Sequence, residues 1–178
     1  MKLKLKSLVT ISALAATAIA PFLLSVGSAS AQPNGTDASY IGAGVAAGIT
    51  NGGSVTGGDA ATIGGNIQGR VAVPKLPVSA RGAVLFSDET SAIIPQVTYD
   101  IGVAKNTNVY VGGGYSFVES KGKPTPLGNQ SAPVVTIGAE SQITDNLVVY
   151  GDAKAGINAY QNSSGSAVSF QAGAGFKF

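Results

Sequence analysis

Six charged residues stand among apolar and small neighbours, and they are the residues of this chain that could carry chemistry. They are three cations and three carboxylates: Arg70, Arg81, Asp100, Glu140, Asp152 and Lys154. Set in a row through a protein, such groups could relay protons or pass ions. Set against one another, they would pair into salt bridges and plug the space around them. The equal numbers of positive and negative groups favour the salt-bridged plug.

The composition of the chain excludes several classes of chemistry. The sequence contains no His and no Cys, so it lacks the commonest general base and every thiol nucleophile or thiolate ligand. The glycine-rich stretch 51–65 lacks the Gly-Lys-Ser/Thr of a phosphate-binding loop. The other acidic residues form no spaced set of oxygen ligands. We therefore expect no enzyme activity, no cofactor and no metal site.

Residues 1–31 predict a secretory signal peptide that is removed from the mature chain. Lys2, Lys4 and Lys6 precede an apolar stretch, and a small-residue cleavage site ends at Ala31. Without this leader the chain has eight basic and nine acidic residues. That balance leaves no basic surface, so we expect no binding to nucleic acid.

After a polar tail at 32–38, which we expect to be flexible, apolar residues alternate with small or polar ones. In the last segment, for example, Phe170 and Ala172 face one way and Gln171 faces the other. This period of two predicts β-strands. The predicted strands span residues 40–49, 62–73, 78–86, 92–103, 109–118, 133–143, 147–157 and 168–178.

The connections between the predicted strands alternate in length. Those after the first, fifth and seventh strands are long, those after the fourth and sixth are tight, and the one after the third is also short. Long loops on one side and tight turns on the other are typical of outer-membrane barrels. After the leader no apolar run approaches the length of a membrane helix, although 44% of the residues are apolar and only 11% are charged. The open alternatives are a soluble barrel or sandwich and a membrane barrel.

The polar face of the predicted strands favours the membrane barrel. It carries many glycines and few long solvating side chains, which suits the crowded interior of an eight-stranded barrel better than a hydrated exterior. The fold that we predict is all-β: a single eight-stranded antiparallel up-and-down transmembrane β-barrel over residues 39–178. We expect the six charges to form one buried network in its lumen.

Aromatic residues on the apolar face lie near the predicted strand ends. Two such rings of aromatic side chains are typical of the two membrane interfaces of a barrel. The predicted outer ring contains Phe86, Phe117 and Phe170, and the predicted periplasmic ring contains Tyr99, Phe176 and Phe178.

The last segment, Val168 to Phe178, resembles the closing strand of small outer-membrane barrels, and the turn Thr144-Asp145-Asn146-Leu147 is also similar to theirs. The resemblance to the OmpA/OmpX-type family extends over nearly all of the mature chain. It implies export to the bacterial outer membrane, contact with outer-membrane lipid, and recognition of the terminal Phe178 by the barrel-assembly machinery. It also implies a monomer.

Three functions are compatible with this pattern. The first is a non-enzymatic barrel that supports envelope integrity or presents its loops for surface interactions, with a lumen filled by side chains. The second is a narrow porin-like pore for small solutes. The third is a soluble lipocalin-like carrier, which would require the apolar face to point inward.

Overall fold

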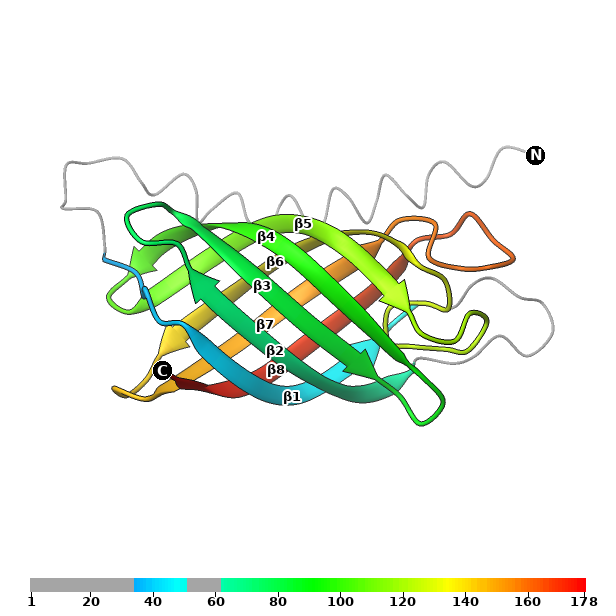
Figure 1. Ribbon diagram of the computed structural model, residues 1–178, viewed down its shortest axis with the longest axis horizontal. Helices are drawn as coiled ribbons and strands as arrows, with labels where there is room; N and C mark the ends of the chain where they lie inside the picture. Colours follow the sequence, from blue (N-terminus) through cyan, green and yellow to red (C-terminus); the bar gives the residue numbers. More distant parts are fainter. Residues whose placement is uncertain (1–33, 51–61) are drawn as a thin grey trace. The chain divides into compact units, whose positions relative to one another are not determined.

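The computed structural model describes residues 34–50 and 62–178 and folds them into eight β-strands (Figure 1). The predicted signal peptide and the predicted loop at 51–60 lie outside the described residues. The strands are β1 (Tyr40–Gly48), β2 (Ile63–Ala72), β3 (Val78–Phe86), β4 (Ser91–Ala104), β5 (Thr107–Val118), β6 (Ala132–Gln142), β7 (Leu147–Gly156) and β8 (Ala167–Lys177).

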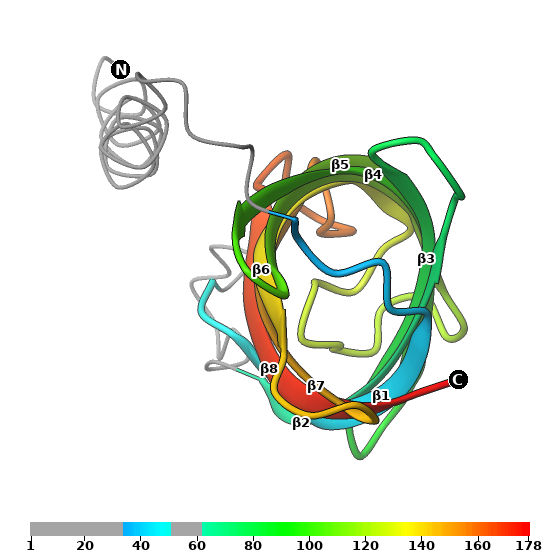
Figure 2. The same cartoon turned by 90° about the vertical axis from the view of Figure 1, so that its left-hand side faces the viewer.

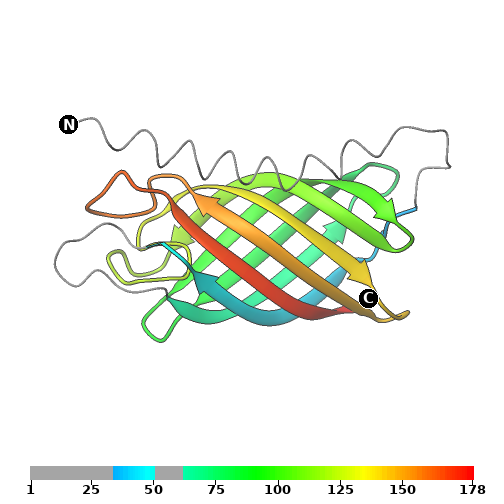
Figure 3. The ribbon, with the colours of Figure 1, turned by 180° about the vertical axis from the view of Figure 1, so that it is seen from behind.

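The strands form one closed antiparallel sheet in chain order, because β1 pairs with β8 as well as with β2. Tyr40 lies opposite Lys177 at one end of this seam, and Gly48 lies opposite Ser169 at the other. The two strands lie side by side when the barrel is seen from behind (Figure 3). The predicted all-β, eight-stranded, up-and-down antiparallel barrel is therefore confirmed. Among the described residues, no helix is long and apolar enough to cross a membrane.

The two ends of the barrel differ in the length of their connections. The end with tight turns is called the turn end, and its connections are residues 73–77, 105–106 and 143–146. The opposite end is called the loop end, and its connections are residues 49–62, 87–90, 119–131 and 157–166. The short 87–90 link is the exception that the sequence already indicated.

Burial alternates along each strand, so the barrel has an apolar outer face and a largely polar lumen. On the outer face, Ile63 is 77% exposed and Val45 is 64% exposed, whereas the lumen side chains of Arg81 and Lys154 are almost fully buried. Within the described strands, Lys177 is the one charged side chain that is not buried in the lumen. Lys177 is the last residue of β8, at the turn end of the barrel.

Candidate functional site in the barrel lumen

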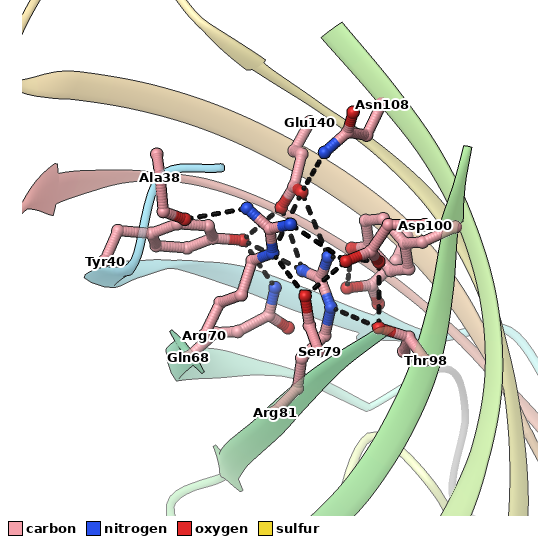
Figure 4. Close-up of polar contacts among 12 residues, drawn as sticks. Ala38, Tyr40, Gln68, Arg70, Ser79, Arg81, Thr98, Asp100, Asn108 and Glu140 are labelled. Atoms are coloured by element: carbon pink, nitrogen blue, oxygen red, sulfur yellow. Dashed lines mark hydrogen bonds and ion pairs between the residues drawn. The ribbon is translucent and has the colours of Figure 1, made fainter. Parts of the chain in front are cut away.

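Four of the predicted charges meet in a compact cluster near the turn end (Figure 4). The Nη2 atom of Arg70 lies 2.8 Å from Oδ2 of Asp100, and its Nε lies 3.2 Å from Oε1 of Glu140. The guanidinium of Arg81 lies 3.1 Å from Asp100 and 2.9 Å from Glu140. Each arginine therefore contacts both carboxylates, which arrive from β4 and β6.

This double pairing is needed because Arg70 and Arg81 lie directly opposite each other on β2 and β3. Like charges in that relation repel and would weaken the sheet. Two carboxylates between the guanidinium groups compensate both positive charges. The cluster is thus a closed set of two cations and two anions without net charge.

Hydroxyl groups complete the hydrogen bonding of the cluster. Ser79 donates to Oδ2 of Asp100, and Thr98 donates to its Oδ1 over 3.0 Å. The phenol of Tyr40 donates to Glu140 over 3.0 Å. A buried ion pair stabilises a fold only when its remaining hydrogen-bonding positions are filled in this way.

The other two predicted charges form a separate pair. Nζ of Lys154 lies 2.6 Å from Oδ1 of Asp152, two residues away on the same strand. The six charges therefore do not all meet directly, because these two residues of β7 pair with each other. Tyr110 connects this pair to the cluster. Its hydroxyl donates a hydrogen bond to Asp152 over 3.0 Å, and the Cζ atom of Arg81 lies over its ring at 3.7 Å from the ring centroid.

The segment 34–38 differs from the flexible tail that the sequence predicted, because it lies across the mouth of the barrel at the turn end (Figure 2). Both backbone groups of Thr36 bond to the side-chain amide of Asn108, over 3.1 Å for the N–H and 2.7 Å for the carbonyl. Nη1 of Arg70 donates to the carbonyls of Thr36 and Ala38. The segment is held because the lumen offers donors and acceptors that match its backbone.

Tyrosine rings fill the lumen where the facing strands carry glycine. A Cβ at Gly173 would lie 2.5 Å from the phenol oxygen of Tyr150, and one at Gly138 would lie 2.5 Å from the ring of Tyr110. Tyr150 also stacks on Tyr40, with ring centroids 5.8 Å apart. The tyrosine rings thus pack into the space that the missing side chains of these glycines leave free.

The loop end is closed by apolar packing. Leu127, from the loop between β5 and β6, is fully buried. It packs in one cluster with Leu85, Ile94 and several smaller apolar residues. Figure 2 shows this loop, in yellow-green, beyond the turn-end opening of the barrel. The lumen therefore holds the four-residue ion cluster near the turn end, the pair of Asp152 and Lys154 farther along β7, and hydrocarbon at the loop end.

The loops at this end are tied to one another by hydrogen bonds. The amides of Asn129 and Gln130 donate to the carbonyl of Ala159, and Ser87 donates to the carbonyl of Pro124 over 2.7 Å. Burial raises the pKa of Tyr160, and its hydrogen bond with the side-chain hydroxyl of Thr50 offsets part of that shift. The loop end is consequently a connected surface.

The predicted aromatic residues all lie on the outer face, each at least 41% exposed: Phe86, Tyr99, Phe117, Phe170, Phe176 and Phe178. Phe86 ends β3 at the loop end, whereas Phe176 lies opposite Leu147 at the turn end. The N–H of Phe178 donates to the carbonyl of Ser39 over 3.1 Å. The rings thus lie at both ends of the outer face, and their place at the membrane interfaces, like the role of Phe178 in assembly, stays a prediction.

Several lumen residues were not identified as site residues from the sequence. Tyr110 and Tyr150 fall on the polar face of their strands, where a bulky phenol among glycines is a usable signal. Thr36 and Asn108 gave no signal, because their contact joins segments 72 residues apart. Among the described residues, no three carboxylates lie close enough to hold a metal ion.

Comparison with known proteins supports this architecture at the level of the fold. No protein-family model matches the sequence, and no curated protein matches it. The chain is similar in structure to Ail, the attachment invasion locus protein of Yersinia pestis, with a TM-score of 0.52, 14% identity, and coverage of 80% of this chain and 100% of Ail.

Two further solved structures are similar. The N-terminal β-barrel domain of Pseudomonas aeruginosa OprF gives a TM-score of 0.53 at 14% identity, covering 82% of this chain and 100% of that domain. Neisserial surface protein A gives 0.54 at 16% identity, covering 79% and 97%. The chain therefore has the fold of the small eight-stranded outer-membrane β-barrels.

The lumen pair predicts a measurable coupling. Lys154→Met leaves the Asp152 carboxylate buried without its cation and should cost about 3–5 kcal/mol of unfolding free energy. Adding Asp152→Asn should recover part of that loss. A double-mutant cycle on unfolding in detergent measures the coupling, and strictly additive losses would contradict the pairing.

The tyrosine–glycine packing predicts a position-dependent cost for alanine. Gly173→Ala should destabilise the barrel by about 1–3 kcal/mol, because its Cβ would overlap Tyr150 and a backbone carbonyl. Gly82→Ala is the matched control, since a Cβ there meets nothing within 4 Å. Equal unfolding free energies for the two variants would show that the lumen does not need this glycine.

The position of the segment 34–38 across the turn end predicts that its backbone amides are protected from exchange with solvent. Gly35→Ala should displace the segment, because a Cβ there overlaps the Asn108 amide. The Thr36 amide should then exchange with solvent about tenfold faster or more, a loss of about 1.4 kcal/mol of local protection. Amide exchange followed by NMR in micelles measures this. Asn34→Ala is the control, because Asn34 bonds to Asn106 through its backbone carbonyl, and equal exchange in both variants would contradict the anchoring.

Proposed function

We propose that this protein is a non-enzymatic integral barrel of the bacterial outer membrane, exported by its predicted signal peptide. Its role is to support the envelope or to present its loop end for interactions at the cell surface. The observation that carries the proposal is the distribution of side chains, with apolar groups around the outside and the ion pairs inside. A barrel that spans a bilayer requires this distribution, since a charge facing lipid at mid-bilayer costs about 2–4 kcal/mol.

The filled lumen supports a structural role over transport. The cluster of Arg70, Arg81, Asp100 and Glu140 occupies one part of the lumen, and the packing around Leu127 occupies another. An ion would have to separate these charges and then pass hydrocarbon. The same arrangement opposes a soluble carrier, whose interior would be apolar and whose exterior would be polar.

The connected loop end supports a role in surface interactions. Loops that are already ordered lose little conformational entropy on binding a partner. The similarity to Neisserial surface protein A and to the attachment invasion locus protein agrees with such a role, although a shared fold carries no function by itself. The loops are thus the part of the chain to test for partners.

The membrane location predicts the behaviour of the protein on fractionation. The chain should remain with the outer membrane after washing, and detergent-extracted protein should migrate differently on gels before and after heating, because a closed barrel resists denaturation at room temperature. The variant Gly173→Ala, with its weakened barrel, should lose the difference at a lower temperature. A product recovered free in the periplasmic fraction would contradict the proposal.

The filled lumen predicts electrical silence. Purified protein in planar bilayers should give no steady conductance steps, whereas a porin reconstituted in the same way should conduct. Reproducible steps of one size from the folded protein would favour the pore instead. Their disappearance after heat unfolding would show that they come from the barrel and not from a contaminant.

A further inference from the structure

A groove lies on the outer wall of the barrel near the turn end, and no side chain of the described residues fills it. It has a volume of about 380 Å³. We call it the wall groove, and the side chains and glycines that form it are Ile41, Gly69, Val71, Ala80, Gly82 and Phe178. Tyr40, Arg70 and Arg81 also border it, but their side chains are buried in the lumen, so they contribute backbone.

The floor of the wall groove is a pair of glycines that lie directly opposite each other on β2 and β3. A Cβ at Gly82 would meet nothing within 4 Å, and one at Gly69 would meet only a carbonyl oxygen at 3.9 Å. In the lumen, by contrast, a Cβ at Gly173 would overlap its neighbours. The wall glycines therefore leave space that the fold does not require.

The rim of the wall groove is apolar and exposed. Ile41 and Val71 flank the glycines on β1 and β2, and both are more than half exposed. Phe178 borders the same groove and is held in place by the hydrogen bond of its N–H to Ser39. An occupant must therefore be apolar and slender, and it must reach the wall from the side.

We propose that the wall groove binds one acyl chain of a phospholipid from the leaflet at the turn end. The groove is continuous with the apolar outer face, so lipid hydrocarbon is the apolar partner that surrounds it on every side. A flexible chain of methylene groups fills a shallow depression between two glycines without needing a polar contact. The inference rests on the proposed membrane location, and the experiment separates the two.

The sequence contains no Trp, so a single introduced Trp reports on one place. Phe178→Trp places an indole at the rim of the wall groove, and Val111→Trp places one on the exposed outer face of β5. Each protein is reconstituted in bilayers with increasing fractions of a phospholipid brominated on its acyl chains. The quenching of Trp fluorescence at each brominated fraction reports how much lipid hydrocarbon lies in contact with that indole.

The expected result is a preference for the groove, seen as a quenching constant about threefold or more higher for the Phe178→Trp protein than for the Val111→Trp protein. Adding Gly82→Leu to Phe178→Trp should fill the groove and remove the preference. Gly113→Leu is the matched control, because Gly113 is an exposed glycine of β5 with its nearest neighbour at 3.6 Å from a Cβ. It should leave the preference unchanged, and a heat-shifted gel band confirms that each variant is folded.

Three results would overturn the inference. Equal quenching constants at the two positions, or a preference that survives Gly82→Leu, would show that the groove holds no chain. Weaker quenching at Phe178→Trp than at Val111→Trp, together with dimers trapped by chemical cross-linking of the same samples, would show that a second copy covers the wall groove. The absence of quenching at both positions would overturn the membrane location as well, because neither Trp would then face lipid.

Discussion

Eight strands enclose a space that only side chains can fill, and this narrowness governs the rest of the structure. A charge that points into the space cannot reach bulk water, so it needs an opposite charge and hydrogen bonds at contact distance. Arg81 meets this condition by pairing with two carboxylates while its guanidinium covers the ring of Tyr110. The same lack of space explains why phenol rings lie over glycines.

The two ends of the lumen are closed by different interactions. At the turn end, backbone carbonyls of residues 34–38 accept hydrogen bonds from the guanidinium of Arg70 and from the side-chain amide of Asn108. At the loop end, Leu127 packs among apolar side chains. Both closures bury the side chains between them, and the lower dielectric of a buried site strengthens the ion pairs there. The interior of this barrel thus combines buried ion pairs with an apolar cluster at the loop end, whereas most of its apolar strand residues face outward.

A scaffold of this kind leaves two surfaces on which members of the fold can differ. Among the described residues of the loop end, hydrogen bonds join the connections at 87–90, 119–131 and 157–166, so these loops present their polar groups together. The outer wall is largely apolar, and the pair Gly69 and Gly82 leaves a depression in it at one place. The proposed surface role rests on the first of these surfaces, and the proposed lipid site rests on the second.

The strands and the face of each side chain follow from the alternation in the sequence, because a period of two assigns every residue of a strand to one face. Arg70, Asp100 and Lys154 all fall on the polar face in this way. Which charges meet depends instead on how the strands close into a barrel. Glu140 reaches Arg81 across the lumen from β6, whereas Asp152 pairs with its own strand neighbour.

The segment before β1 shows the same division. Its residues do not alternate and are polar, so the sequence predicted a flexible tail. Thr36 is nevertheless buried, because the closed barrel places Asn108 where both backbone groups of Thr36 can bond to it. Such a contact depends on the diameter of the barrel and on the offset between its strands. Neither quantity is encoded in the local pattern of residues, since both arise only when β1 pairs with β8.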